Sequence, residues 1–129
     1  MAGKRVLVGG IGADLGSRVA VRLEDESWVG DLLGIDSDPP RRRLHRTDVR
    51  LADPADRQRI VELITDFDPQ VVVYVSVWEP SSRAAPLKAK ELTDQAAVSM
   101  LGAIAECRSL ETLVVRSGLE VYGRRRGSP

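Results

Sequence analysis

The sequence predicts an α/β fold: a doubly wound parallel sheet of about five strands in the order 3-2-1-4-5, with helices on both faces. Two observations support this prediction. Short β-branched runs alternate along the chain with stretches of helical periodicity, which is typical of parallel strands joined by right-handed crossovers. The run from Val71 to Val75 has no polar interruption, as expected for a strand that is covered on both faces.

The first half of the chain predicts three strands and one helix. A β-branched run that ends in glycines predicts a buried first strand. The next stretch repeats at helical spacing, with Leu15, Val19 and Leu23 on its apolar face. Turn residues then separate a second strand from a short third one. In chain order, these elements are expected over residues 4–8, 13–26, 32–36 and 44–49.

The second half predicts two helices and two strands. Asp53 is a suitable N-cap for the first of these helices, Pro54 suits its first position, and Asp68 with Pro69 ends it. The second helix is long and carries Cys107 on its apolar side. In chain order, these elements are expected over residues 54–67, 71–75, 87–108 and 113–115.

The composition fits one globular domain and excludes several functions. The 129 residues are 43% hydrophobic and 29% charged, and 19 Lys and Arg balance 19 Asp and Glu. This neutral chain has no global field that would attract nucleic acid or an anionic membrane, and no apolar run is long enough to cross a bilayer. Cys107 has no second cysteine to pair with, so a cytoplasmic location is expected. One histidine, His45, and one cysteine do not make a metal site.

A glycine-rich turn, Gly9-Gly10-Ile11-Gly12-Ala13-Asp14-Leu15-Gly16, joins the first predicted strand to the first helix. Glycines allow a tight turn and a close approach of the backbone to a pyrophosphate, while the helix N-terminus offers N–H groups to the anion. Ala13 stands where a strict G-x-x-G-x-x-G pattern has glycine, and Gly12 adds flexibility beside it. Asp36 follows at the end of the second strand, where a carboxylate suits the adenosine ribose hydroxyls. Together these residues predict dinucleotide binding.

Asp36 also indicates which dinucleotide is bound. A carboxylate at this position repels a 2′-phosphate, so NAD is favoured over NADP. The triplet Arg41-Arg42-Arg43 is expected to be a solvated loop, as Arg124-Arg125-Arg126 is expected to be a solvated tail. The first triplet would offset the preference for NAD only if its loop folded back onto the site.

These motifs resemble the extended short-chain dehydrogenase/reductase family, the NAD-dependent epimerase/dehydratases, in their N-terminal Rossmann-like portion. The resemblance extends from Arg5 to Gly123 and also rests on Gly34-Ile35-Asp36, Asp48-Val49-Arg50 and Arg116 to Gly123. It implies an NAD(P)-binding domain over residues 1–123, truncated relative to the family, and a polar tail over residues 124–129.

The resemblance also implies the roles of individual residues. The pyrophosphate would lie on the glycine turn and the adenosine ribose on Asp36. The adenine would lie between two residues of the third strand, and the nicotinamide ribose over a small-residue turn after the fourth. In that order, the implied cofactor-binding residues are Gly10, Gly12, Ala13, Asp14, Leu15 and Gly16, then Asp36, then Asp48 and Val49, then Val75, Ser76 and Val77.

The chain departs from the family at the positions that carry catalysis. Family members use a Tyr-x-x-x-Lys pair in which the lysine lowers the pKa of the tyrosine. Here Tyr74 is followed four residues later by Trp78, and Tyr122 by Arg126, which does not readily share a proton. Gly118 stands where the family has a catalytic Ser or Thr. The sequence therefore assigns no catalytic residue and names no substrate.

Three hypotheses about function remain open. In the first, the chain is the NAD-binding portion of an epimerase/dehydratase-like protein and is inactive by itself. In the second, it is a stand-alone, degenerate nucleotide-binding module with a regulatory or protein-interaction role. In the third, it is an enzyme that borrows its missing groups from a partner chain. In each case the fifth strand would present Val114 and Val115 at a sheet edge, which predicts self-association or pairing with a partner.

Overall fold

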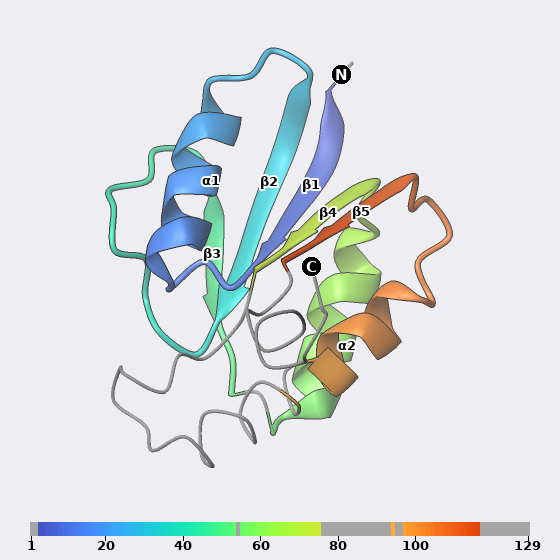
Figure 1. Ribbon diagram of the computed structural model, residues 1–129. Helices are drawn as coiled ribbons and strands as arrows, with labels where there is room; N and C mark the ends of the chain where they lie inside the picture. Colours follow the sequence, from blue (N-terminus) through green and yellow to red (C-terminus); the bar gives the residue numbers. More distant parts are fainter. Residues whose placement is uncertain (1–2, 54, 76–93, 95–96, 117–129) are drawn as a thin grey trace, which may run out of the picture.

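The computed structural model, which describes residues 3–53, 55–75, 94 and 97–116, confirms the predicted sheet (Figure 1). All pairings are parallel, and the strand order is β3-β2-β1-β4-β5. The most central strand, β1, pairs with β2 on one side and with β4 on the other. The elements are β1 (Lys4–Gly9), α1 (Asp14–Glu24), β2 (Val29–Asp36), β3 (Asp48–Leu51), α2 (Arg57–Phe67), β4 (Val71–Tyr74) and β5 (Thr112–Val115).

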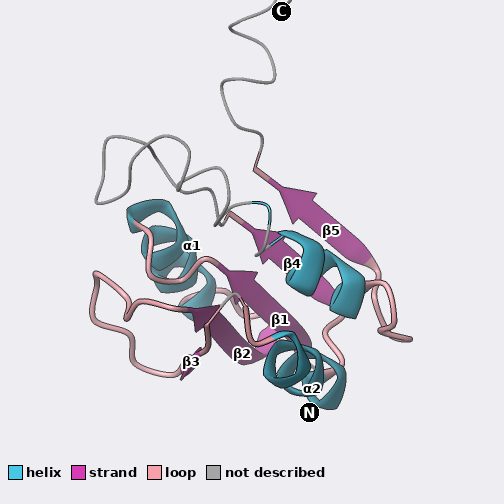
Figure 2. Ribbon diagram, turned by 90° about the horizontal axis from the view of Figure 1, so that it is seen from below, coloured by secondary structure: helices cyan, strands magenta, loops and turns pink. Residues whose placement is uncertain are grey.

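Helices cover both faces of the sheet, so the protein has two apolar cores. Figure 2 shows α1 on one face, and α2 with the helical residues 97–104 on the other. Because side chains alternate along a strand, Val6 and Val8 point into the first core while Leu7 points into the second. All three are fully buried. Because both faces of β1 are buried here, Val6, Leu7 and Val8 are all apolar.

The helix α1 packs on the sheet partly as predicted, because Val19 and Leu23 lie against the core, but its most buried residues are smaller ones. Its buried residues are Gly16, Ser17 and Ala20, whereas Leu15, expected on the apolar face, is 40% exposed. A Cβ atom at Gly16 would collide with the carbonyl oxygen of Gly10. The first turn of α1 thus lies directly on the preceding turn, and the packed face is rotated toward these small residues.

Several predicted boundaries are wrong. The second strand begins at Val29 instead of Leu32, and three other elements are shorter than predicted. The third strand begins at Asp48 instead of Leu44. Asp53 accepts a hydrogen bond from the Ala55 N–H and so forms a turn, while Asp56 caps α2 by accepting from the Arg59 N–H. The last helix ends at residue 104, before Cys107. In each of these three elements a short local turn interrupts a pattern that the sequence periodicity extends too far. Pro54 lies outside the described residues.

The connection from β2 to β3, residues 37–47, is a loop that is anchored on α1. Near its end, the Glu24 carboxylate accepts hydrogen bonds from the backbone N–H groups of His45, Arg46 and Thr47, and from the Thr47 hydroxyl at 2.7 Å. The Arg46 guanidinium donates to the carbonyl oxygens of Glu24 and Gly30. These bonds attach the loop to the C-terminal end of α1 and to the start of β2.

The Glu24 anchor predicts acid sensitivity. Burial raises the pKa of this carboxyl, but the bonds from Thr47, Arg46 and His45 outweigh burial, and the net pKa is below its ordinary value. A lowered pKa in the folded state stabilises the protein above the unfolded-state value, and that stability is lost as the pH falls through the folded-state value. We expect Glu24→Gln to cost about 1–2 kcal/mol at pH 7 and less as the pH falls toward 3. Urea unfolding across this range measures the difference, and an equal cost at both pH values would contradict the assignment.

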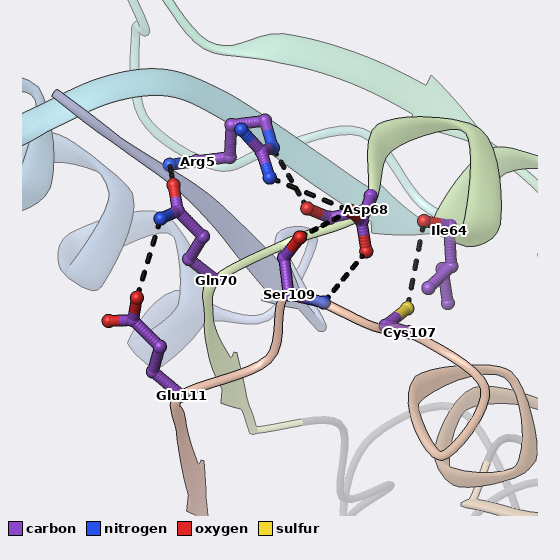
Figure 3. Close-up of polar contacts among 7 residues, drawn as sticks. All are labelled: Arg5, Ile64, Asp68, Gln70, Cys107, Ser109 and Glu111. Atoms are coloured by element: carbon purple, nitrogen blue, oxygen red, sulfur yellow. Dashed lines mark hydrogen bonds and ion pairs between the residues drawn. The ribbon is translucent and has the colours of Figure 1, made fainter. Parts of the chain in front are cut away.

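A second polar network ties the strands together at their amino ends (Figure 3). Asp68 ends α2 in the left-handed conformation, with φ 50°. Its carboxylate accepts from the Ser109 hydroxyl and N–H, and its carbonyl oxygen accepts from the Arg5 guanidinium at 2.8 Å. Cys107 lies beside Ile64, and burial raises the pKa of its thiol. This network lies at the amino ends of the strands, so a binding site at their carboxyl ends would lie at the opposite end of the sheet.

Candidate dinucleotide-binding site

The turn between β1 and α1 has the backbone shape that the sequence predicted. Gly10 has φ 95°, a conformation that costs other residues energy. Its N–H donates to the Ile35 carbonyl oxygen at 2.9 Å, and its own carbonyl oxygen accepts from the Ala13 N–H at 3.1 Å. Ala13 is the N-cap of α1 and makes no side-chain capping bond. No capping side chain therefore occupies the N–H groups at the start of α1, which include those of Asp14 and Leu15. These groups point toward the N-terminal end of the helix, where an anion would bind.

Asp36 lies beside this turn, at the carboxyl end of β2. Its Oδ2 accepts from the Gly12 N–H at 2.8 Å, and its Oδ1 accepts from the Ser37 N–H at 2.6 Å. Burial raises the pKa of this carboxyl, and the Gly12 and Ser37 bonds only partly offset it. A Cβ atom at Gly12 would lie 2.9 Å from Asp36 Oδ2. Glycine at this position thus lets the backbone approach the carboxylate closely, and the structure brings the two predicted parts of the site together.

The register of β3 brings residues near Asp36 that the sequence motif missed. Asp48 pairs with Leu33 at the start of β3, whereas Leu51 pairs with Asp36 at its end. The Ala52 N–H then donates to the Asp36 carbonyl oxygen at 2.8 Å. The adenine role of Asp48 and Val49 stays a prediction. Leu51 and Ala52 occupy the strand end, and only the register could have revealed them.

The other side of the turn is formed by β4. The Val75 N–H donates to the Gly9 carbonyl oxygen at 2.8 Å, and Val75 is buried. A Cβ atom at Gly9 would lie 2.8 Å from a ring carbon of Tyr74 and 2.7 Å from the Met100 methyl group. This crowding accounts for glycine at this position. Ser76 and Val77, predicted beneath the nicotinamide ribose, lie outside the described residues.

The remaining candidates form no second site within the described residues. His45 is exposed, and the part of the chain that the structure describes holds no group of three or more potential metal ligands. None of its helices is long and apolar enough to cross a membrane. Tyr74 is buried on β4 beside Gly9. Trp78, Gly118, Tyr122 and Arg126 lie outside the described residues.

One arginine of the first triplet, Arg41, is exposed but also bonded to the site. The Arg41 N–H donates to the Ser17 hydroxyl at 2.8 Å, and its Nε donates to the Gly12 carbonyl oxygen at 3.1 Å. Arg42 lies 3.6 Å from Asp14 in an exposed ion pair. All three arginines of the triplet are exposed, as expected for a solvated loop, but Arg41 also contacts the glycine turn. A charge run by itself does not reveal the contact, because it depends on the path of the loop along α1.

Comparison with known families agrees with the geometry. The sequence profile of the NAD dependent epimerase/dehydratase family matches residues 6–129. The chain belongs to this family. A comparison with curated proteins found no match.

Several enzymes of known structure have a similar fold. The Bordetella bronchiseptica enzyme WbmH, in complex with NAD⁺, is 20% identical to this chain with a TM-score of 0.73, and the chain covers 45% of it. UDP-glucose 4-epimerase from Brucella ovis, in complex with NAD, is 22% identical with a TM-score of 0.73, and the chain covers 37% of it. Uronate dehydrogenase from Agrobacterium tumefaciens is 22% identical with a TM-score of 0.65, and the chain covers 44% of it. Between 93% and 98% of this chain is matched, but it spans less than half of each of these structures.

Proposed function

We propose that this chain binds NAD at the carboxyl ends of β1 and β2, with residues 1–123 as its cofactor-binding domain. The single observation that carries the proposal is the contact between Asp36 and Gly12, because it places a carboxylate for the ribose hydroxyls beside a glycine turn for the pyrophosphate. The pyrophosphate would lie on the turn formed by Gly10, Gly12, Ala13 and Gly16. NAD complexes of similarly folded enzymes support the same choice of cofactor.

The contribution of these residues is to bind and orient the cofactor. NAD supplies hydride transfer when it is bound. The backbone N–H groups of Asp14 and Leu15 would face the pyrophosphate, and Asp36 would accept hydrogen bonds from the ribose. We assign no proton-transfer residue in this chain, since neither tyrosine is followed by the lysine of the Tyr-x-x-x-Lys pair. The free thiol of Cys107 is consistent with the reducing cytoplasm.

Calorimetric titration of the chain with NAD tests the proposal. We expect saturable binding with one site per chain, and tighter binding of NAD than of NADP. Absence of binding of either dinucleotide at millimolar concentration would overturn it. Turnover by this chain alone in a reductase or epimerase assay would contradict the assignment of a binding role without catalysis.

The exposed strand β5 supports self-association. It lies at the edge of the sheet, and Leu113, Val114 and Val115 are 42%, 51% and 49% exposed. An apolar edge with unpaired backbone groups is a template for a second strand. We expect the chain to form oligomers, and Val114→Lys to shift them toward monomer in light scattering. Val98→Lys, at a 60% exposed position off the sheet, is the control. A wild-type chain that is monomeric at high concentration, or equal dissociation by both variants, would contradict pairing at this edge.

A further inference from the structure

Ser17 joins three segments that are distant in the sequence. Its side chain is fully buried, one turn into α1. The hydroxyl donates to the Ile11 carbonyl oxygen at 2.7 Å and accepts from the Arg41 N–H at 2.8 Å. A hydroxyl has one proton to donate and lone pairs to accept with, so both functions are in use. Ser17 thereby attaches the loop of residues 37–47 to the glycine turn.

Arg41 completes the attachment through its side chain. Its Nε donates to the Gly12 carbonyl oxygen at 3.1 Å, while the Gly12 N–H donates to Asp36 Oδ2 at 2.8 Å. Both backbone polar groups of Gly12 are therefore held, one by Arg41 and one by the carboxylate. Glycine loses more conformational freedom on ordering than any other residue, so these two bonds restrict the most adaptable residue of the turn.

We propose that Ser17 and Arg41 are positioning residues that hold Ile11 and Gly12 in the shape the cofactor needs. The inference rests on the proposed NAD site. A turn already held in its binding conformation loses less entropy when the ligand arrives, so its affinity is higher. The other anchor of the same loop, formed by Glu24 and Arg46, touches the opposite end of α1 and does not contact the turn. Affinity should therefore depend on Ser17 and Arg41, and not on loop attachment in general.

Calorimetric titration of Arg41→Ala and Ser17→Ala with NAD tests the inference. We expect Arg41→Ala to bind NAD about tenfold more weakly, the effect of losing its one side-chain hydrogen bond to the turn, worth about 1.4 kcal/mol. Ser17→Ala loses both the bond to Ile11 and the bond from Arg41, so we expect its affinity to fall by at least the same factor. Arg41→Lys retains a donor and should recover part of the affinity. NADP affinity should fall by the same factor as NAD affinity, because the residue acts through the turn. A much larger loss for NADP would make Arg41 a direct phosphate ligand and overturn the positioning role.

Two controls separate positioning from general stability. Arg46→Ala removes the guanidinium bonds of the other anchor, to the carbonyl oxygens of Glu24 and Gly30, and should lower the Tm while leaving the NAD Kd within about twofold. Thr65→Val deletes a hydroxyl that donates to the Val61 carbonyl oxygen on α2, and should also leave NAD binding unchanged. Equal weakening by Arg46→Ala and Arg41→Ala would overturn the inference. If Ser17→Ala fails to fold, the exposed Arg41 still provides the test.

The design also separates this inference from the proposed function. A wild-type chain that binds no NAD would overturn the function itself. A wild-type chain that binds NAD, together with Arg41→Ala and Ser17→Ala variants that bind it equally well, would overturn only the role of Ser17 and Arg41.

Discussion

Replacing Asp36 with alanine is expected to weaken NAD binding by about hundredfold, which corresponds to about 3 kcal/mol. The carboxylate would accept hydrogen bonds from the ribose hydroxyls, and bonds to a charged group are each worth about 1.5–3 kcal/mol. It also holds the Gly12 N–H at 2.8 Å, so the variant additionally loosens the glycine turn. Calorimetric titration measures both the affinity and the number of sites.

Two further variants and a pH series test the role of Asp36. Asp38→Ala removes a neighbouring carboxylate, and we expect it to bind NAD within about threefold of wild type. In wild type the Gly12 and Ser37 N–H groups donate to different oxygens of Asp36. Asp36→Asn replaces one of these oxygens with an NH2 donor, so in the same geometry it keeps only one of the two bonds. Burial raises the pKa of Asp36, so protonation should begin to weaken NAD binding at a higher pH than an ordinary aspartate would. Asp36→Ala should lack this pH dependence, and wild-type affinity in that variant would refute the assignment.

The strand order and most elements could be predicted because burial leaves a strong periodic signal. The run from Val71 to Val75 is apolar since one face of β4 is buried and the other is partly buried. The turn after β1 keeps its glycines since the backbone there is crowded. Boundaries were less predictable. Asp53 and Asp56 are both reasonable caps for α2, and only the bond from the Arg59 N–H to Asp56 distinguishes them.

The site was predictable where one segment determines it and not where two segments meet. Gly10, Gly12 and Gly16 follow from local turn geometry, and Asp36 follows from its place at the end of a strand. Arg41 reaches Gly12 only because residues 37–47 run along α1, and nothing in a basic triplet indicates that path. Leu51 lies beside Asp36 because of a strand register, which sequence alone did not fix.

The second large effect concerns Gly16. We expect Gly16→Ala to lower the free energy of unfolding by about 2–3 kcal/mol and to abolish measurable NAD binding. The added Cβ atom would collide with the Gly10 carbonyl oxygen and with backbone atoms of Ile11. These are main-chain atoms of the turn itself, so no side-chain rotation relieves the clash, and α1 must move away from the pyrophosphate position. Urea unfolding and NAD titration measure the two effects.

Gly102→Ala is the matched control, because Gly102 also lies in a helix. Its added Cβ atom would meet only the end of the Arg57 side chain at 3.6 Å, an ordinary contact. Alanine in place of glycine within a helix is favourable by about 0.5–1 kcal/mol, so we expect a small gain in stability and unchanged NAD affinity. The same substitution should thus have opposite effects at two helical glycines. If Gly16→Ala behaved like Gly102→Ala, the close packing of α1 on the glycine turn would not be what forms the site.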